Sequence, residues 1–423
     1  LLRVSDDDVL DGIKDLRAKE QIKIEEREEI ATTNGKTELC IQTWIYLIDY
    51  YKTELNIAQR ILGLEQADNI KRIPNFNKEL EKTEKATSLE LSEKQVEAVK
   101  MVNDNNVCII TGGPGTGKTT IIKTIIDIYK SRGKKVVLCA PTGRAAKRMT
   151  EATGEEASTL HRLLEIGKVS DEKPDPDLDV TPIDADVVII DEMSMVDIFL
   201  MNYVVKALFK GTKLVLVGDT DQLPSVGPGT VLKDLIDSKR VPCVRLNKIF
   251  RQALQSEIIV NSHKVNEGIN FLEDSQNGEV DENFAQINKL KKQGETKPSS
   301  QTGTRNDFFF IQEKSTPQIV SKILELYNLD EQIITPSKKG DLGTKNLNKL
   351  IQEKFNPASA IKQEKKFGEV IYREGDKIMQ TKNNYDIMWR RKSEINSGIF
   401  NGEMGVIEKI DDEVIEEISE EEK

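Results

Sequence analysis

The chain contains the run Val107-Cys-Ile-Ile-Thr-Gly-Gly-Pro-Gly-Thr-Gly-Lys-Thr-Thr120, which predicts the architecture around it. Its segment Gly112–Thr119 fits the pattern G-x-x-x-x-G-K-[ST] without a mismatch. The apolar stretch Val107–Ile110 before the loop predicts a buried strand, and Thr119–Lys130 after it predicts a helix. A strand, this loop and a helix, in that order, are the context in which the pattern binds phosphate.

The residue types in this loop suit a bound nucleoside triphosphate. Glycines let the backbone curl so that its N–H groups face phosphate oxygens, and the helix N-terminus adds a partial positive charge. We expect Lys118 to reach the β and γ phosphates of ATP and the Thr119 hydroxyl to ligate Mg²⁺. The alternative is a glycine-rich turn without a ligand. The residues expected to contact ATP are Gly113, Pro114, Gly115, Thr116, Gly117, Lys118, Thr119 and Thr120.

A second anchor is the run Val187-Val-Ile-Ile-Asp-Glu192, in which a buried strand ends in two carboxylates. Strand ends of a parallel sheet share one edge, so these carboxylates are expected to face the glycine loop. We expect Asp191 to hold Mg²⁺ and Glu192 to orient and polarise the attacking water. Carboxylates at a strand end can also be helix caps, and this is the alternative interpretation.

Further apolar runs alternate with helical segments after Leu91. They are Val136–Ala140, Val187–Asp191, Leu214–Gly218 and Ile333–Thr335. Short apolar runs separated by helices are typical of buried parallel strands with crossover helices. The sequence therefore predicts an α/β fold with a doubly wound core.

The first 88 residues predict helices instead. Ser5 with Asp8 forms the pattern of a capping box, and the apolar residues that follow recur on one helical face. A second helix is predicted over Glu38–Glu65, and residues 66–90 are polar enough to be a linker. The polar segment 272–306 is predicted to be a long loop or insertion.

Bulk composition limits the class of protein. The length of 423 residues indicates three or four domains, and no apolar run approaches the roughly 20 residues that cross a bilayer.

The net charge of −11 is unusual for a protein that binds nucleic acid, although a motor needs only a local basic groove. Four scattered cysteines predict neither zinc nor disulfides and favour a reduced, cytoplasmic location: Cys40, Cys108, Cys139 and Cys243.

Six blocks in order carry a resemblance to a known family. They are Ala140–Arg148, Asp191–Ser194, Gly218–Gly227, Ile249–Gln252, Thr335–Asn348 and Gly375–Asn384. The first four resemble motifs Ia, II, III and IV of the RecD-like branch of superfamily 1 helicases, and the similarity runs from about residue 39 to residue 407.

The resemblance implies roles at the nucleotide. Gln95 matches the glutamine that reads adenine, since a side-chain amide can donate and accept at once. Gln222 matches a motif III sensor, and Arg251 matches an arginine that reaches the γ-phosphate. A planar, permanently charged guanidinium suits that task. The expected catalytic residues are therefore Lys118, Glu192, Gln222 and Arg251. A solvated glutamine and a surface arginine are the simpler alternatives.

The resemblance also implies contacts with single-stranded DNA. They fall on Pro141, Thr142, Gly143, Arg144 and His161. Backbone and hydroxyl donors read phosphate without reading sequence. Lys147 and Arg148 can be a solvated helix face, and His161 can be structural. Tyr385 and Trp389 can stack on bases or pack in a core.

The resemblance implies an overall organisation as well. A helical domain and linker (1–88) would precede two RecA-like motor domains (89–243 and 244–370) and the start of a small β-barrel insertion (371–423). Residues of about 160–185 would form a strand-separating pin. The implied activity is an ATP-dependent helicase that moves 5′→3′ on single-stranded DNA and uses ATP and Mg²⁺. We expect a monomer, with other DNA-repair or recombination proteins as candidate partners.

The chain departs from this family in one respect. It lacks recognisable motifs V and VI, and it begins with Leu1, so we expect a piece of a longer protein. Two alternatives to a helicase stay open. One is a nucleotide-gated DNA-binding subunit without unwinding activity, and the other is a P-loop phosphotransferase that ignores DNA.

Overall fold

The structure is a computed structural model. It describes residues 4–33, 36–68, 71–166, 178–250, 256–270, 307–308, 310–313, 315–329, 331–382, 384–391, 394–399 and 401–411. The chain divides into two compact units, Leu1–Lys248 and Ile249–Lys423, and each is described by itself.

The first unit is built on a six-stranded parallel sheet with the order β5-β4-β6-β7-β3-β8. All four apolar runs predicted as strands in this unit are confirmed, and the short strand β5 and the edge strand β8 are additional. The strands are β3 (Val107–Gly112), β4 (Val136–Ala140), β5 (Ala157–Thr159), β6 (Val187–Ile190), β7 (Lys213–Gly218) and β8 (Cys243–Leu246).

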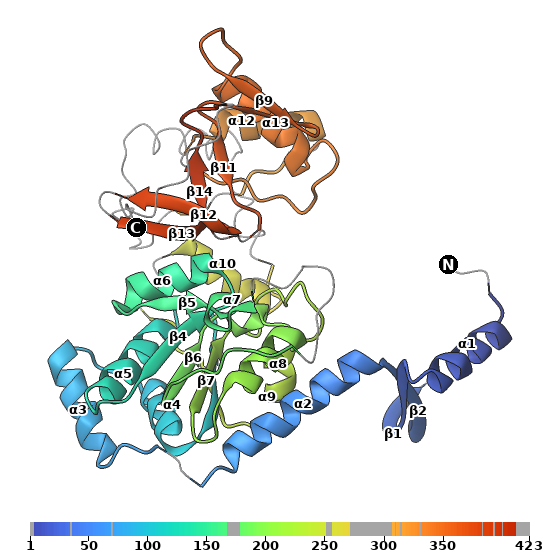
Figure 1. Cartoon of the computed structure of the whole chain (residues 1–423), viewed down its shortest axis with the longest axis vertical. Coiled ribbons are helices and arrows are strands. Elements are labelled where there is room, and N and C mark those ends of the chain that lie inside the picture. The colour runs from blue at the N-terminus through green and yellow to red at the C-terminus, as the bar shows by residue number, and fades with distance from the viewer. Residues whose placement is uncertain are drawn as a thin grey trace. The chain divides into compact units, whose positions relative to one another are not determined.

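Helices cover both faces of this sheet (Figure 1). Two separate apolar clusters result, one on each face, and every residue of β3 and β7 is buried between them. The predicted doubly wound α/β core is therefore confirmed. Its helices are α4 (Glu93–Asp104), α5 (Lys118–Lys130), α6 (Gly143–Thr153), α7 (Leu160–Leu163), α8 (Ile198–Ala207) and α9 (Val231–Asp237), with the short 3₁₀ helix η2 (Met193–Met195).

The N-terminal region is only partly helical. Helix α1 (Asp6–Ala18) begins with the predicted capping box, in which Ser5 and Asp8 bond each other's backbone N–H groups. An antiparallel pair follows, β1 (Ile22–Thr33) and β2 (Lys36–Leu47). The predicted helix over Glu38–Glu65 is therefore wrong in its first part, because its alternating apolar residues pair as a strand, and only α2 (Ile48–Glu65) is helical.

Helix α2 is fixed to the sheet unit through α8. Its buried residues Thr53, Ile57, Ile61 and Leu64 recur at helical spacing. The Asn56 side chain donates to Asn202 Oδ1 over 2.5 Å. The predicted linker after α2 also needs correction, because it contains α3 (Phe76–Thr87), whose residues Phe76 and Leu80 lie in the apolar core.

The second unit contains helices and antiparallel strands. Its helices are α10 (Glu257–Asn266), α12 (Thr316–Leu326) and α13 (Thr344–Phe355). Its strands pair as β9 (Glu364–Phe367) with β10 (Val370–Arg373), β11 (Lys377–Met379) with β14 (Met404–Val406), and β12 (Asn384–Arg391) with β13 (Glu394–Ile399).

This unit confirms the predicted β-rich segment but not the predicted strand Ile333–Thr335, which is irregular. Within its described residues the strands pair only antiparallel, so a second RecA-like domain stays a prediction. The polar insertion 272–306 lies outside the described residues. Among the residues that are described, no helix has both the length and the apolar character needed to cross a bilayer.

A buried lysine joins two layers of the first unit. Lys213, the first residue of β7, is fully buried and donates from Nζ to the carbonyl oxygens of Val102 (2.8 Å), Asn103 (3.0 Å) and Asn105 (2.7 Å). These carbonyls end helix α4, where a cation is favourable. Burial lowers the pKa of Lys213 to about 8, so the ammonium form still predominates at pH 7. Its three hydrogen bonds offset part of the hydration that it loses.

We expect Lys213→Met to destabilise the first unit by about 3 kcal/mol, because three carbonyls at a helix end lose their donor. Chemical denaturation followed by circular dichroism measures the change. Lys210→Met, on an exposed turn before the same strand, is the matched control and should be near neutral. Equal denaturation midpoints for the two variants would show that the buried ammonium adds no stability.

Candidate nucleotide-binding site

The glycine loop connects β3 directly to α5. Gly115 (φ 75°) and Gly117 (φ 82°) adopt the left-handed conformation, which favours glycine. At Gly112 a Cβ atom would lie 2.8 Å from Thr116 Oγ1 and 2.9 Å from the backbone oxygen of Leu246. The pattern of glycines is thus required by the tight curl of the backbone, which turns the loop towards the N-terminus of α5.

Two side chains of the loop fold back on it. Lys118 donates from Nζ to the carbonyl oxygens of Gly112 (2.5 Å) and Gly113 (3.2 Å). Thr116 is buried, and its hydroxyl donates to Gly113 O over 2.8 Å. The Lys118 ammonium is therefore held over the mouth of the loop, where a phosphate chain would lie. Thr119 and Thr120 follow on the first turn of α5.

The two predicted carboxylates follow β6. The Asp191 N–H donates to Cys139 O of β4 over 3.0 Å, and its Oδ1 accepts from the Glu192 N–H over 2.9 Å. Glu192 adopts the left-handed conformation (φ 55°, ψ 42°), which costs a residue with a Cβ atom on the order of 1 kcal/mol. Strained backbone of this kind is common at functional sites.

The electrostatics of these carboxylates link them to the loop. Burial raises the pKa of Asp191, while the Glu192 N–H, Lys118 and Arg148 oppose the shift. Burial and then the charge of Asp191 raise the pKa of Glu192, again against Lys118 and Arg148. Both carboxylates therefore lie within the field of Lys118. From the sequence, Arg148 of α6 could be a solvated side chain. In the structure its charge lowers the pKa of both Asp191 and Glu192.

The loop after β7 adds two further groups. Asp219 is buried, accepts from the Asp221 N–H over 3.0 Å, and its charge contributes to raising the pKa of Glu192. Gln222 is exposed, and its Oε1 accepts from the Ser194 hydroxyl over 3.5 Å. Motifs II and III are thus in contact through these side chains. No role was predicted for Asp219 from the sequence, although it directly follows a buried strand as Asp191 does.

Gln95 occupies an unusual environment. It lies in the first turn of α4 with 2% of its surface exposed, and its Oε1 accepts from the Ser92 N–H (3.0 Å) and the Ser92 hydroxyl (3.2 Å). Its Nε2 is buried and has no hydrogen-bond partner in the described part of the chain. A buried donor without a partner costs about 1–3 kcal/mol, so an acceptor on a bound base would relieve that cost.

The candidate DNA residues lie at the ends of β4 and β5. Pro141 and Thr142 follow β4, and the Thr142 hydroxyl accepts from the Ala145 N–H over 3.2 Å as the N-cap of α6. Gly143 and Arg144 start that helix, and His161 lies in α7. The capping role of Thr142 was not predicted, but its hydroxyl hydrogen stays available to donate.

Some predicted residues cannot be placed. Arg251 and residues 167–177 of the predicted pin lie outside the described residues. Nothing is therefore added to their predicted roles. Trp389 is described, and its indole N–H donates to Gly398 O of the paired strand over 2.9 Å.

The donor set fits a metal that arrives with a nucleotide. The described residues contain no group of three or more His, Cys, Asp or Glu side chains placed to hold an ion. Thr119 and Asp191 offer two oxygen ligands. Mg²⁺ typically binds through one or two protein oxygens, with phosphate oxygens and water completing its octahedron. The unpartnered Gln95 donor and the Lys118 ammonium fit the base and the phosphates of the same ligand.

Comparison with known proteins gives matches in two separate parts of the chain. Residues 95–228 match the AAA domain family. Residues 347–419 match the SH3 domain of ATP-dependent RecD-like DNA helicases.

Two relatives extend over most of the chain. The ATP-dependent RecD2 DNA helicase of Deinococcus radiodurans is 34% identical over 319 residues, which cover 75% of this chain and 38% of that protein. The RecBCD enzyme subunit RecD of Buchnera aphidicola subsp. Schizaphis graminum is 28% identical over 414 residues, which cover 86% of this chain and 66% of the relative. The chain thus spans less than two thirds of the length of either relative.

Solved structures of Pif1 helicases are also similar. The Bacteroides Pif1 bound to single-stranded DNA matches with a TM-score of 0.37 and 19% identity, over 77% of this chain and 70% of that one. The match to the RecD-like SH3 domain lies entirely outside the nucleotide loop, which many ATPases share. The chain is therefore similar to RecD-like DNA helicases over most of its length, and its residues 347–419 are similar to their SH3 domain.

Proposed function

We propose that this chain is the motor part of an ATP-dependent DNA helicase that moves 5′→3′ along single-stranded DNA. The main observation behind this proposal is that Lys118, Asp191 and Glu192 cluster at one edge of the sheet. The charge of Lys118 lowers the pKa of both carboxylates there. Sequence similarity supports the coupling to DNA, since a relative is named an ATP-dependent DNA helicase. The direction rests on the resemblance to RecD proteins alone.

The proposed hydrolysis step uses the residues as follows. Lys118 neutralises charge on the β and γ phosphates, and Thr119 and Asp191 would hold Mg²⁺, which would supply further positive charge at the phosphates. Glu192 accepts a proton from water as the water oxygen attacks the γ phosphorus, and the bond from that phosphorus to the β–γ bridging oxygen breaks. Lys118 and the backbone N–H groups of the loop stabilise the developing negative charge.

Coupling to DNA is proposed to pass through Gln222, which contacts Ser194 beside the carboxylates. Arg251 is proposed to complete the γ-phosphate site. Pro141, Thr142, Gly143, Arg144 and His161 are proposed to bind the strand. We also propose a cytoplasmic monomer, with other repair or recombination proteins as possible partners because one relative is named a subunit of RecBCD.

The primary test is ATP hydrolysis by this chain with and without single-stranded DNA. We expect strong stimulation by DNA. Tight nucleotide binding without stimulated turnover would instead indicate a DNA-binding subunit or a piece that needs the rest of its protein. Turnover that ignores DNA would indicate a phosphotransferase.

We expect Lys118→Ala to reduce ATP turnover by about 10²–10³-fold or more, because a charge that stabilises the transferred phosphoryl group is lost. Steady-state phosphate release measures the effect. Lys123→Ala, on an exposed position of the same helix, is the control and should keep full turnover. Undiminished turnover in Lys118→Ala would remove the assignment of the loop.

We expect Glu192→Gln to bind ATP normally but to hydrolyse it at least 100-fold more slowly, since the proton acceptor is lost. Because burial and Asp191 raise the pKa of Glu192, the ionised base is lost as pH falls through a value above the usual range for glutamate. The pH profile of kcat should therefore decline on its acid side at that raised value. A wild-type profile that stays flat to below pH 5 would argue against Glu192 as the base.

We expect Gln95→Ala to reduce the preference for ATP over pyrimidine triphosphates, because the buried Nε2 donor would no longer meet an acceptor on the base. The loss should appear as a rise of about tenfold in KM for ATP with little change for CTP, as one buried hydrogen bond is worth about 1.5 kcal/mol. Gln95→Glu, which keeps the cap but replaces the donor, separates base recognition from helix stability. An unchanged ratio of KM values in both variants would make Gln95 purely structural.

A further inference from the structure

The loop that follows β7 is attached to the first unit at two points. Near its start, the Gln222 side chain is bonded to η2. At its end, Pro228 O accepts from the Ile198 N–H, the first amide of α8, over 3.0 Å. Between these points Leu223 has 86% of its surface exposed and Val226 is fully exposed. Because apolar side chains that face solvent add no packing, the position of the loop depends on its two attachments.

Asp197 lies at the centre of the second attachment. It is the N-cap of α8, and its Oδ1 accepts from the Leu200 N–H over 2.8 Å. Its other carboxylate oxygen faces Gly227, where a Cβ atom would lie 1.9 Å from Oδ2 and 2.6 Å from Cγ. Non-bonded atoms cannot approach so closely, so only glycine fits against this carboxylate.

The end of the loop follows the surface of α8 at backbone distance. Gly227 does not adopt the left-handed conformation, so its contact with Asp197, and not its backbone angle, excludes a side chain there. At Gly229 (φ 92°) a Cβ atom would lie 2.3 Å from Ile198 Cγ2. The Ser225 hydroxyl lies 2.9 Å from Gly227 O and 3.0 Å from Gly229 O, and it holds this stretch together.

Helix α8 gives the attachment a fixed support. Every residue of Phe199–Val205 is buried. The segment that joins Glu192 to Asp197 is short, and Met193 and Val196 within it are buried in the apolar core. Asp197 is therefore held in place relative to Glu192, the proposed base.

We propose that Asp197 is a positioning residue for Gln222. Its carboxylate holds Gly227 against α8 and thereby keeps the loop of motif III at a defined place beside Glu192. The inference rests on the proposed function, in which Gln222 couples the nucleotide to DNA. Asp197 lies outside the six blocks that carry the resemblance, and a helix cap alone would need only its Oδ1.

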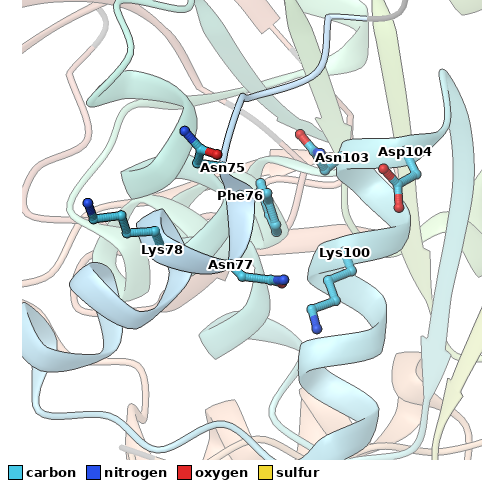
Figure 2. A pocket seen from close by; sticks show the side chains of 7 residues that line it. All are labelled: Asn75, Phe76, Asn77, Lys78, Lys100, Asn103 and Asp104. Carbon is cyan, nitrogen blue, oxygen red and sulfur yellow. The ribbon is translucent and has the colours of Figure 1, made fainter.

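A pocket between α3 and α4 is a weaker candidate for a further site. It has a volume of about 600 Å³, and Lys78, Lys100 and Asp104 are among the residues that line it. Figure 2 shows the two ammonium groups pointing apart, and Asp104 adds a negative charge. These groups do not converge on one ligand.

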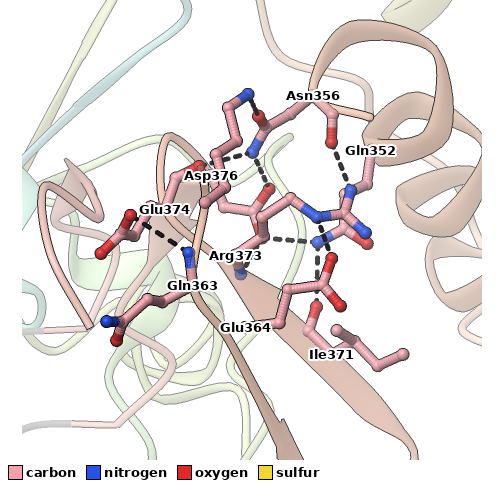
Figure 3. Close-up of polar contacts among 9 residues, drawn as sticks. Gln352, Asn356, Gln363, Glu364, Ile371, Arg373, Glu374 and Asp376 are labelled. Carbon is pink, nitrogen blue, oxygen red and sulfur yellow. Dashed lines mark hydrogen bonds and ion pairs between the residues drawn. The ribbon is translucent and has the colours of Figure 1, made fainter. Parts of the chain in front are cut away.

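A charged cluster in the second unit is satisfied within the protein. Arg373 is 7% exposed, and its guanidinium donates to Glu364 Oε1 (2.5 Å) and to the carbonyl oxygen of Asn356 (Figure 3). Asp376 accepts from the side chains of Gln352 (2.5 Å) and Asn356 (2.7 Å). These bonds hold the end of β10 to α13, so the cluster is structural.

Substitutions at Asp197 separate its cap from its contact with Gly227. Asp197→Ser keeps a good N-cap but is too short to reach the glycine, whereas Asp197→Asn keeps both. We expect Asp197→Ser to lower the DNA-stimulated kcat for ATP about tenfold or more with KM for ATP unchanged, because a small misplacement of a catalytic group is costly. Its thermal unfolding midpoint should stay close to that of wild type.

Two controls accompany this measurement. Asp197→Asn should keep the wild-type kcat, since the amide has the size and shape of the carboxylate. Asp184→Ser makes the same chemical change at an exposed carboxylate that pairs only with Lys135 at the surface, and it should also keep the wild-type kcat.

An exchange of side chains across the contact tests its geometry. Gly227→Ala should lower the DNA-stimulated kcat at least about tenfold, because its methyl group would meet the Asp197 carboxylate. Adding Asp197→Gly removes that carboxylate and leaves an acceptable N-cap, so it should recover part of the loss. Additive effects of the two changes in a double-mutant cycle would show that the contact plays no part in turnover.

Amide hydrogen exchange, followed by mass spectrometry, examines the loop without turnover. Peptides that cover residues 219–230 should exchange faster in Asp197→Ser than in wild type, and Asp197→Asn should match wild type. Unchanged exchange in Asp197→Ser would overturn the contact itself.

The kinetic outcomes distinguish this inference from the proposed function. A wild-type kcat in Asp197→Ser, an equal loss in Asp197→Asn, or a loss that follows a lowered unfolding midpoint would overturn the positioning role alone, provided that DNA stimulates the wild type. If DNA does not stimulate ATP hydrolysis by the wild type, the proposed function fails. The role at Gln222 then fails with it, even where hydrogen exchange shows that the contact exists.

Discussion

The site depends on one geometric constraint, which is that the carboxyl ends of neighbouring parallel strands meet at a single edge of a sheet. Strands β6, β7 and β3 are consecutive neighbours. Asp191 follows the first, Asp219 the second and the glycine loop the third. Residues more than a hundred positions apart in the chain therefore converge because of the strand order. The two apolar layers that bury β3 and β7 fix this edge, so packing at the core sets the geometry of the chemistry.

The converged groups break local rules of stability. Glu192 takes up a backbone conformation that glycine or asparagine would adopt more easily, and Gln95 buries a donor without a partner. Natural proteins concentrate such violations at functional sites and compensate for them in the surrounding structure. In this unit the compensation is visible in the fully buried strands and in the Lys213 bonds to the end of α4, the helix that begins near Gln95.

Local patterns with a strong physical cause were predictable from the sequence. The glycine loop, four parallel strands and the capping box at Ser5 are confirmed, since each depends on residues close together in the chain. Strand β5 was missed because it has only three residues, and β8 because it lies at an edge and alternates exposed with buried positions. Neither has the continuous apolar run by which a central strand is recognised.

The errors in the N-terminal region have a different cause. The dipeptide Asn34-Gly35 stands between two stretches rich in β-branched and aromatic residues, and it is a strong hairpin signal that the helical interpretation of Glu38–Leu47 overlooked. Helix α3 was called a linker because most of its residues are charged, although Phe76 and Leu80 alone suffice to bind it to the core. The influence of Arg148 on the carboxylates could not be predicted, since an exposed helix arginine looks the same in sequence whichever way it faces.

The charge balance of the site bears on its chemistry. The charges of Asp191 and Asp219 add to burial in raising the pKa of Glu192, whereas Lys118 and Arg148 lower it. A triphosphate would add several negative charges to this edge. The proposed Mg²⁺ would offset part of that charge, together with Lys118 and the N–H groups of the loop. Burial, together with the charge of Asp191, keeps the pKa of Glu192 raised, which suits a residue that must take a proton from water and release it in each cycle. The acidic composition of the chain is compatible with a nucleic-acid motor, because the charge of each local surface, and not the net charge of the chain, determines what binds there.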